Sequence, residues 1–305
     1  MRVAVTGASG FLGARLVQCL CDVGHQVHVL SRNLERTLAS LPAGVTGTSW
    51  VGWEVPDGAL AGVEAVVHLA GEPVDQRWTR EVKHRIHDSR VLGTRAVVAA
   101  LERAGTVRRF VSASAVGYYG GARGAQPLTE SHAPGDDFLA RVCQDWETEA
   151  LRARAAGVAT AVLRIGVVLH PSGGALHRML PLFRVGAGGR VGAGLQYVSW
   201  VHREDLVDLL RFVVERPELE GALNATSPVP VTNAEFAHAL GRVLERPAGM
   251  HVPGLVLKAR FGEMARVVLE GQRVLPARAL ERGFVFQHPE LEAALRDLLG
   301  PAALA

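Results

Sequence analysis

The chain has 305 residues, of which 48% are hydrophobic and 21% are charged, proportions typical of a soluble globular protein. Its 33 basic and 30 acidic residues leave a formal net charge of +3, too small an excess for the clustered basic surface of a nucleic-acid-binding protein. We therefore expect a small-molecule substrate and no nucleic-acid partner. The sequence leaves the oligomeric state open.

The three cysteines, Cys19, Cys21 and Cys143, are too few and too irregularly spaced for a disulfide scaffold or a zinc site, and no metal is expected. No run of 18 apolar residues offers a membrane span, and no signal peptide precedes the first predicted strand. These features favour a reducing compartment. They predict a cytoplasmic protein without a membrane partner.

The first half of the chain alternates short apolar runs with longer helical patterns. Strands are predicted at 2–6, 25–31, 45–51, 63–70, 109–114 and 158–169, and helices at 11–23, 80–103 and 137–156. Strands that alternate with helices form βαβ units around a parallel sheet. Residues 1–170 therefore predict an α/β fold of the Rossmann type, with a doubly wound parallel sheet.

The second half is richer in glycine and proline. Residues 171–199 are expected to be loop and short helix, and longer helices are predicted at 204–215, 233–245, 254–270 and 289–299. We expect residues 171–305 to form mostly a smaller C-terminal substrate lobe, with some segments returning to the core. Such a lobe would cover the carboxyl ends of the strands, where open α/β sheets bind ligands.

A glycine-rich turn directly after the first strand gives the strongest motif. Gly7 permits a tight turn, Gly10 permits close approach of a pyrophosphate, and Gly13 lets the helix pack against the strand. The helix N-terminus then offers free N–H groups to phosphates. The motif lies between a predicted strand and a predicted helix, the context that distinguishes a dinucleotide site from a plain glycine turn.

The residues after the second strand indicate which dinucleotide is bound. Enzymes selective for NAD place Asp or Glu there to hold the ribose 2′-OH, whereas this chain has Ser31-Arg32. A guanidinium pairs with a 2′-phosphate, which a carboxylate would repel. The pattern favours NADP (NADPH) as cofactor. The alternative is that Arg32 is a solvated loop residue.

Several strings, taken together and in order, resemble an extended short-chain dehydrogenase/reductase. They are Thr6-Gly-Ala-Ser-Gly-Phe-Leu-Gly13, His68-Leu-Ala-Gly71, Ser112-Ala-Ser114 and Trp200-Val-His-Arg-Glu-Asp205. Others are similar to its atypical, nucleotide-sugar-epimerase-like branch of epimerase family proteins, including Leu69-Ala-Gly-Glu-Pro73, Asp88-Ser-Arg90, Trp146-Glu147 and Arg164-Ile-Gly-Val-Val-Leu169. The resemblance runs from Met1 to about Leu299, through the family's C-terminal conserved region, and implies a Rossmann fold with a C-terminal lobe and an NADP site.

The resemblance also implies which residues line that site. They are Gly7, Gly10, Phe11, Leu12 and Gly13 for the pyrophosphate, Ser31 and Arg32 for the adenosine phosphate, Leu69, Ala70 and Gly71 beneath the ribose, and Arg90 with Val168 to complete the pocket. Arg90 interrupts an apolar helix pattern, which modestly supports its role. The alternative is a solvated helix position.

The expected catalytic helix departs from the superfamily pattern. A dehydrogenase of this kind uses Tyr-x-x-x-Lys, in which Lys lowers the pKa of the phenol so that Tyr shuttles a proton. Here the Tyr slot holds Leu139 and the Lys slot holds Cys143. Cys143 could act as a nucleophile, but a cysteine on a buried helix face is usually inert.

The remaining catalytic candidates follow the fifth strand. Ser114, Tyr118 and Tyr119 could polarise and protonate a substrate oxygen, although the tyrosines could instead pack under the second lobe. The residues expected to face the substrate are Glu72, Arg77, Gln196 and Trp200. His202 could face the same cleft, but we prefer a structural role in which Asp205 caps the following helix.

Three functions remain compatible with the sequence. The favoured one is an NADP-dependent oxidoreductase or epimerase-like enzyme with an unusual proton donor, acting on a small carbonyl or hydroxyl compound. The second is a catalytically silent NADPH-binding sensor. An ordinary nucleotide-sugar epimerase is the least compatible, because both members of the Tyr–Lys pair are missing.

Overall fold

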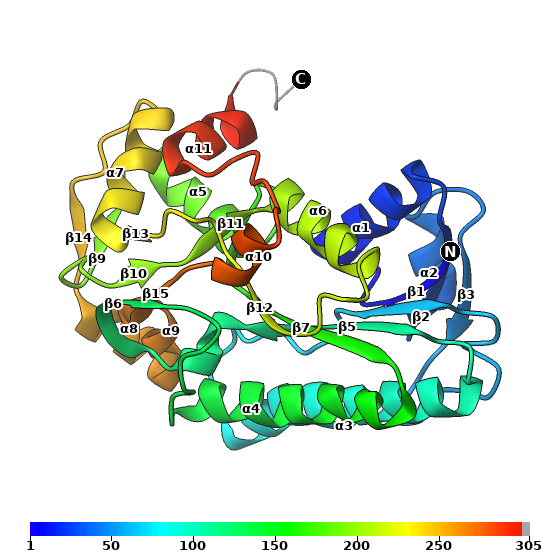
Figure 1. Cartoon of the computed structure of the whole chain (residues 1–305). Coiled ribbons are helices and arrows are strands. Elements are labelled where there is room, and N and C mark those ends of the chain that lie inside the picture. The colour runs from blue at the N-terminus through cyan, green and yellow to red at the C-terminus, as the bar shows by residue number, and fades with distance from the viewer. Residues whose placement is uncertain (301–305) are drawn as a thin grey trace.

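A seven-stranded sheet forms the centre of the computed structural model, which describes residues 1–300 (Figure 1). The strand order is β12-β7-β5-β4-β1-β2-β3, and each pairing is parallel. The strands are β1 (Arg2–Thr6), β2 (Gln26–Ser31), β3 (Thr46–Ser49), β4 (Ala65–His68), β5 (Arg109–Ala115), β7 (Ala159–Ile165) and β12 (Gly221–Ala225). The predicted Rossmann-type fold is confirmed. The strand order reverses between β1 and β4, where such sheets bind ligands.

Helices cover both faces of this sheet (Figure 1). One face carries α1 (Phe11–Asp22), α2 (Leu34–Ala39) and α6 (Arg203–Val214), and the other carries α3 (Arg80–Ala104) and α4 (Phe138–Leu151). Alternation along each strand divides the apolar side chains between two cores. In β1, for example, Val3 and Val5 face α1 and α6, whereas Ala4 faces α3.

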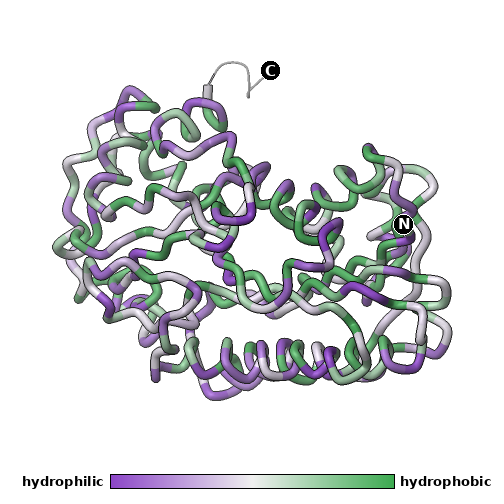
Figure 2. The backbone as a smooth tube through the Cα atoms, viewed as in Figure 1, coloured by the Kyte–Doolittle hydropathy of each residue, from purple (hydrophilic) through white to green (hydrophobic). Residues whose placement is uncertain are grey.

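A second lobe has its own hydrophobic core, and hydrophobic stretches, green in Figure 2, alternate with hydrophilic ones along its backbone. It is built mainly by α5 (Gly174–Arg184), α7 (Asn233–Val243) and α11 (Leu291–Leu299). Its shorter helices are α8 (Gly254–Phe261), α9 (Arg266–Leu269) and α10 (Ala277–Glu281). Two-stranded pairings join β6 (Ala122–Leu128) to β15 (Gly271–Val274), β8 (Val167–Leu169) to β11 (Trp200–His202), β9 (Gly189–Val191) to β14 (Met250–Val252), and β10 (Tyr197–Val198) to β13 (Val231–Thr232).

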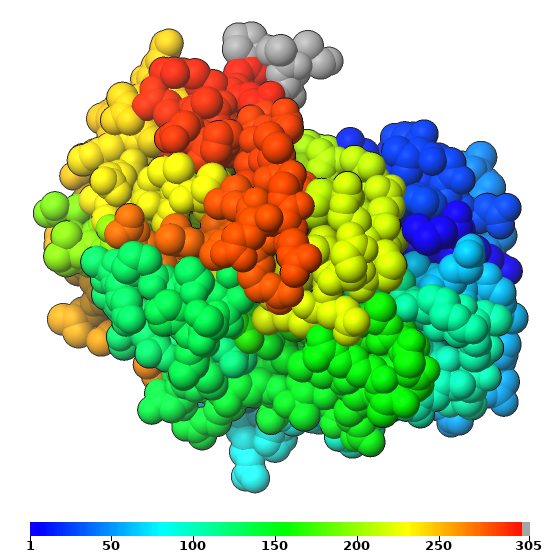
Figure 3. Space-filling model, in the orientation of Figure 1, coloured from blue at the N-terminus to red at the C-terminus, as the bar shows by residue number. Residues whose placement is uncertain are grey.

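Segments from the second half return to the main sheet. Helix α6 packs beside α1, and β12 supplies the edge strand next to β7. Phe284 and Phe286 also join the core on the α1 face. In the space-filling view, the orange segment around these residues lies across both lobes (Figure 3).

Two predicted elements are interrupted. The expected strand at 158–169 divides into β7 and β8 at Gly166, where a Cβ would lie 2.2 Å from the carbonyl oxygen of Ser199. The expected helix at 254–270 divides at Gly262, whose φ of +64° ends α8. The first break depends on a close backbone approach and the second on a positive φ, and helical or strand periodicity reveals neither.

Within residues 1–300, the helices are too short or too polar to span a membrane.

Candidate functional site

The turn between β1 and α1 requires glycine at two positions. Gly7 has a φ of +72°, and a Cβ there would lie 2.9 Å from the backbone nitrogen of Ala70. A Cβ on Gly13 would lie 2.2 Å from the carbonyl oxygen of Gly7. The backbone N–H of Gly10 donates to that same oxygen at 3.0 Å. The start of α1 therefore packs directly on the turn, with its free N–H groups at the carboxyl edge of the sheet.

The end of β4 is fastened to the same turn. The hydroxyl oxygen of Thr6 accepts hydrogen bonds from the backbone N–H groups of Leu69 and Ala70, both at 3.2 Å. Thr6 also bonds to Nδ1 of His68 at 2.7 Å. Burial lowers the pKa of His68 to about 4, so its ring is neutral near pH 7. These bonds place Leu69 and Ala70 beside Gly7, so two parts of the expected cofactor pocket lie together.

Arg90 reaches this pocket from α3. Its Nη1 donates to the carbonyl oxygens of Glu72 at 3.0 Å and Ile86 at 3.1 Å, and its guanidinium lies 5.1 Å from the centre of the Trp146 ring. A Cβ on Gly71 would be 3.3 Å from the guanidinium carbon. Burial lowers the pKa of Arg90. The alternative of a solvated helix position is therefore wrong.

The remaining expected cofactor residues flank the turn on two sides. At the end of β2, Arg32 is exposed, and the Ser31 hydroxyl shares a 2.8 Å hydrogen bond with that of Thr37. On the other side, the Phe11 ring packs against Gly173, where a Cβ would lie 2.8 Å from the ring. Val168 and Leu12 are partly buried against the core on the α1 face.

The two slots on α4 face the turn that follows β5. A Cβ on Gly117 would lie 3.4 Å from Cβ of Leu139 and 3.9 Å from Sγ of Cys143. The two slots that the family resemblance assigns to Tyr and Lys thus hold an apolar side chain and a thiol beside this turn. Burial raises the pKa of Cys143 to about 12, so the thiol stays protonated and is a poor nucleophile.

A buried polar network lies beneath this turn. The Ser114 hydroxyl donates to Glu147 at 2.6 Å, and the Glu147 carboxylate pairs with Arg164 through two contacts of 2.9 Å. Arg164 donates to the Tyr119 hydroxyl at 3.0 Å, and that hydroxyl donates to Asn224 at 2.7 Å. The sequence reasoning did not identify Glu147 or Arg164 as functional. The available signal was an arginine inside the otherwise apolar β7 and a glutamate on the buried face of α4.

This network argues against two of the expected catalytic roles. Ser114 is 3% exposed and gives its only proton to a carboxylate, so in this conformation it does not polarise a ligand. Tyr119 is 0% exposed, and burial raises the pKa of its phenol. Tyr118 is different, because its side chain is partly exposed and its ring is stacked 3.4 Å from the Arg164 guanidinium carbon. Among the three candidates, Tyr118 alone has a partly exposed side chain.

Two family models match the chain. The NAD dependent epimerase/dehydratase family matches residues 3–225, and a domain of unknown function, DUF1731, matches residues 252–298. This chain belongs to the NAD dependent epimerase/dehydratase family. The family resemblance found in the sequence is confirmed.

Individual relatives agree with this family. The epimerase family protein SDR39U1 homolog, chloroplastic, of Arabidopsis thaliana is 42% identical over 306 residues, which cover 98% of this chain and 87% of that protein. A crystal structure of human epimerase family protein SDR39U1 (isoform 2) with NADPH has a TM-score of 0.85 and 33% identity, covering 99% of this chain and 100% of that one. MoeE5 in complex with UDP-glucose and NAD has a TM-score of 0.75 and 25% identity, covering 98% and 97%.

The four expected substrate residues of this epimerase-family chain differ in accessibility. The prediction that Trp200 contacts the substrate is wrong. Its side chain is 0% exposed in the core of the second lobe, and its Nε1 donates to the Val229 carbonyl oxygen at 3.0 Å. The Gln196 amide is used within the second lobe, where it donates to two backbone carbonyl oxygens. Glu72 and Arg77 lie on the loop after β4, and Arg77 is exposed.

The prediction that Asp205 caps the helix that follows it is also wrong. His202 is the N-cap of α6, since its Nδ1 accepts from the backbone N–H of Glu204 at 3.2 Å. Asp205 instead accepts from the backbone N–H groups of Gln287 at 2.8 Å and His288 at 3.0 Å. It thereby fastens a C-terminal segment to α6.

His202, His288 and Asp297 form a cluster whose ligand atoms lie within 4.8 Å of one another. The Nδ1 atom of His202 accepts a hydrogen bond, so the neutral ring carries its proton on Nε2. This Nε2 lies 3.2 Å from Asp297 Oδ2 without good hydrogen-bond geometry. A protonated nitrogen offers no lone pair to a metal, and the cluster does not suit one.

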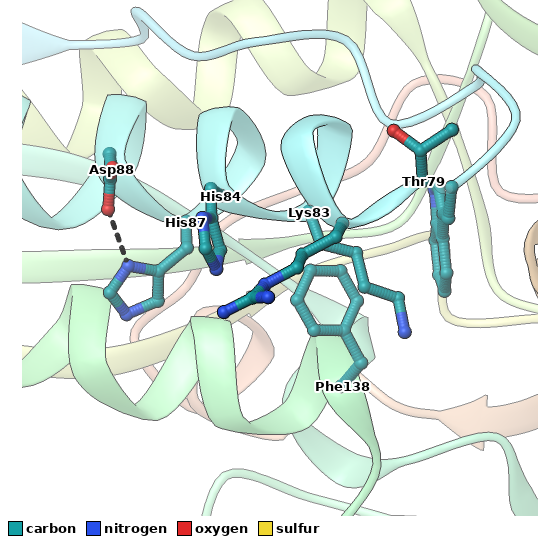
Figure 4. A pocket seen from close by; sticks show the side chains of 8 residues that line it. Thr79, Lys83, His84, His87, Asp88 and Phe138 are labelled. Carbon is teal, nitrogen blue, oxygen red and sulfur yellow. Dashed lines mark hydrogen bonds and ion pairs between the residues drawn. The ribbon is translucent and has the colours of Figure 1, made fainter.

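An open pocket of about 750 Å³ lies on the outer side of α3 and α4 (Figure 4). Its lining consists of Trp78, Thr79, Arg80, Lys83, His84, His87, Asp88 and Phe138. The Lys83 ammonium lies 5.0 Å from the centre of the Phe138 ring and pairs with Glu263. The pocket contains none of the expected site residues and is separate from the candidate site.

Proposed function

We propose that this chain binds NADPH at the carboxyl edge of β1, β2 and β4. The observation that carries the proposal is the glycine turn, where a Cβ would strike backbone atoms, combined with Arg32 in place of an acid after β2. The human relative crystallised with NADPH supports the same choice of cofactor.

Each group of residues has a distinct role in this proposal. The turn from Gly7 to Gly13, with Phe11 and Leu12, receives the pyrophosphate at the N-terminus of α1. Ser31 and Arg32 hold the 2′-phosphate. The backbone of Leu69, Ala70 and Gly71 passes under the ribose, and Arg90 and Val168 complete the walls.

Replacing Gly13 by alanine is expected to weaken NADPH binding about tenfold or more. The new Cβ would lie 2.2 Å from a backbone oxygen, so the start of α1 must move away from the turn, and overpacking of this kind costs about 1–3 kcal/mol. Calorimetric titration measures the change. Gly249→Ala is the control, because a Cβ there meets nothing within 4 Å. Equal affinity of the two variants would show that α1 does not contact the phosphates.

We further propose an oxidoreductase or epimerase-like reaction on a small carbonyl or hydroxyl compound. NADPH supplies the hydride when it is bound. Tyr118 gives a proton to the substrate oxygen, and Arg164, which is fixed by Glu147 and thereby by Ser114, holds the Tyr118 ring in place. Glu72 and Arg77 contact the substrate from the loop after β4.

A second candidate is a catalytically silent NADPH sensor. It is favoured by one observation, that α4 carries Leu139 and Cys143 in the slots that the family resemblance assigns to Tyr and Lys. A screen of NADPH oxidation against carbonyl compounds separates the two. The enzyme proposal expects turnover of at least one compound class. Absence of turnover, together with a protein partner that distinguishes the NADPH-bound and NADP⁺-bound chains, would replace it with the sensor.

A further inference from the structure

An exposed tryptophan lies beside the proposed cofactor site and has no role in it so far. Trp53 follows β3, and its side chain is 53% exposed, while that of the nearby Val51 is 72% exposed. Large apolar side chains that gather on a surface mark contacts with ligands or partners. We therefore expect a ligand or a partner to cover the Trp53 side chain.

Two contacts place the segment carrying Trp53 between groups already proposed to hold NADPH. The backbone N–H of Trp50 donates to the carbonyl oxygen of Ser31 at 2.9 Å, so the segment starts at the end of β2. The indole ring then lies on α3 at Gly93, where a Cβ would be 3.9 Å from Cζ3 of Trp53. Gly93 is about one helical turn from Arg90.

The neighbouring residues Ser31 and Arg32 restrict which ligand can cover Trp53. The proposed function places the adenosine 2′-phosphate at Ser31 and Arg32, and the adenine base is attached to the same ribose. The base must therefore lie within one sugar of these residues, and the segment that begins with the Trp50–Ser31 hydrogen bond lies next to them.

We infer that Trp53 stacks on the adenine ring of bound NADPH. The inference rests on the proposed function. Indole and purine rings stack through their π faces, without any requirement for hydrogen-bond matching. Stacking removes apolar indole surface from water, and it gives the adenine a wall that neither the glycine turn nor Arg32 provides.

Calorimetric titration of Trp53→Ala with three ligands tests this inference. NADPH contains both halves of the cofactor, adenosine 2′,5′-bisphosphate contains only the adenine half, and reduced nicotinamide mononucleotide contains only the other. Trp53→Ala is expected to weaken NADPH and the bisphosphate by the same factor, about tenfold or more, and to leave the mononucleotide unchanged. Trp53→Phe keeps an aromatic face and should lose less. The control Val185→Ala, which truncates an exposed side chain after α5 in the second lobe, should lose nothing.

Fluorescence gives a second test that needs no alanine variant. The bisphosphate is expected to quench tryptophan emission in the wild type and not in Trp53→Phe. Unchanged bisphosphate affinity in Trp53→Ala, or the same quenching in Trp53→Phe, overturns the inference while leaving NADPH binding intact. A wild-type chain that binds neither NADPH nor the bisphosphate overturns the proposed function as well.

Discussion

Replacing Tyr118 by phenylalanine is expected to lower kcat by about 10²–10⁴, the usual contribution of a general acid. Phenylalanine keeps the ring that stacks on Arg164, so it removes the hydroxyl and little else. NADPH affinity should stay unchanged, because Tyr118 is assigned to the substrate and not to the cofactor. The measurement is steady-state turnover of a carbonyl compound found by the screen, with NADPH titration alongside.

Tyr119→Phe is the matched control for this prediction. Tyr119 is fully buried, and its hydroxyl joins Arg164 to Asn224. Its loss leaves buried polar groups without a partner and should destabilise the fold by about 1–3 kcal/mol, with kcat preserved in the folded fraction. A large fall in kcat for Tyr119→Phe with none for Tyr118→Phe would reverse the two roles.

Replacing Glu147 by glutamine is expected to lower the free energy of unfolding by about 3–5 kcal/mol, the cost of breaking a buried ion pair by removing one partner. The side chains of Glu147 and Arg164 are only 8% and 5% exposed. Burial opposes the charge on Arg164, but the paired Glu147 carboxylate raises its pKa above the usual value. Without that carboxylate, a charged guanidinium stays buried and unneutralised. Urea unfolding measures the loss.

Glu149→Gln is the control on the same helix. Glu149 pairs with Arg95 and Arg152, whose side chains are 53% and 62% exposed. Both arginines remain solvated after the change, so the loss should be smaller than for Glu147→Gln. Equal losses would mean that the Glu147–Arg164 pair contributes no more than a surface pair. The position of the Tyr118 ring could then not be attributed to an Arg164 side chain held by Glu147.

Local signals in the sequence were enough for most of the sheet and for the glycine turn. Gly7, Gly10 and Gly13 lie between a strand and a helix in adjacent sequence, so their spacing determines their geometry directly. The strands β1, β2, β4, β5 and β7 could be predicted because each contains a short apolar run, whereas the polar β3 gave a weaker signal within 45–51. Strand β12 was missed, since Gly221–Ala225 contains a single large apolar residue and forms only against β7.

The polar network could not be predicted from sequence, because its members are far apart in the chain. Ser114 meets Glu147 after 33 residues, and Tyr119 meets Asn224 after 105. The same limit explains the error at Trp200. A tryptophan at the start of a short strand has the same local pattern whether it faces a cleft or a core. Only the packing of α5, α7 and α11 around it distinguishes the two.

Calorimetric titration of NADPH and NADH into the wild type and Arg32→Ala tests the central claim most directly. We predict that the wild type prefers NADPH. Arg32→Ala should weaken NADPH about tenfold or more and leave NADH nearly unchanged, because a hydrogen-bonded charge pair contributes about 1.5–3 kcal/mol. Equal affinity of the wild type for the two cofactors, or an equal loss for both in Arg32→Ala, would contradict the assignment of Arg32 to the 2′-phosphate and with it the choice of NADPH.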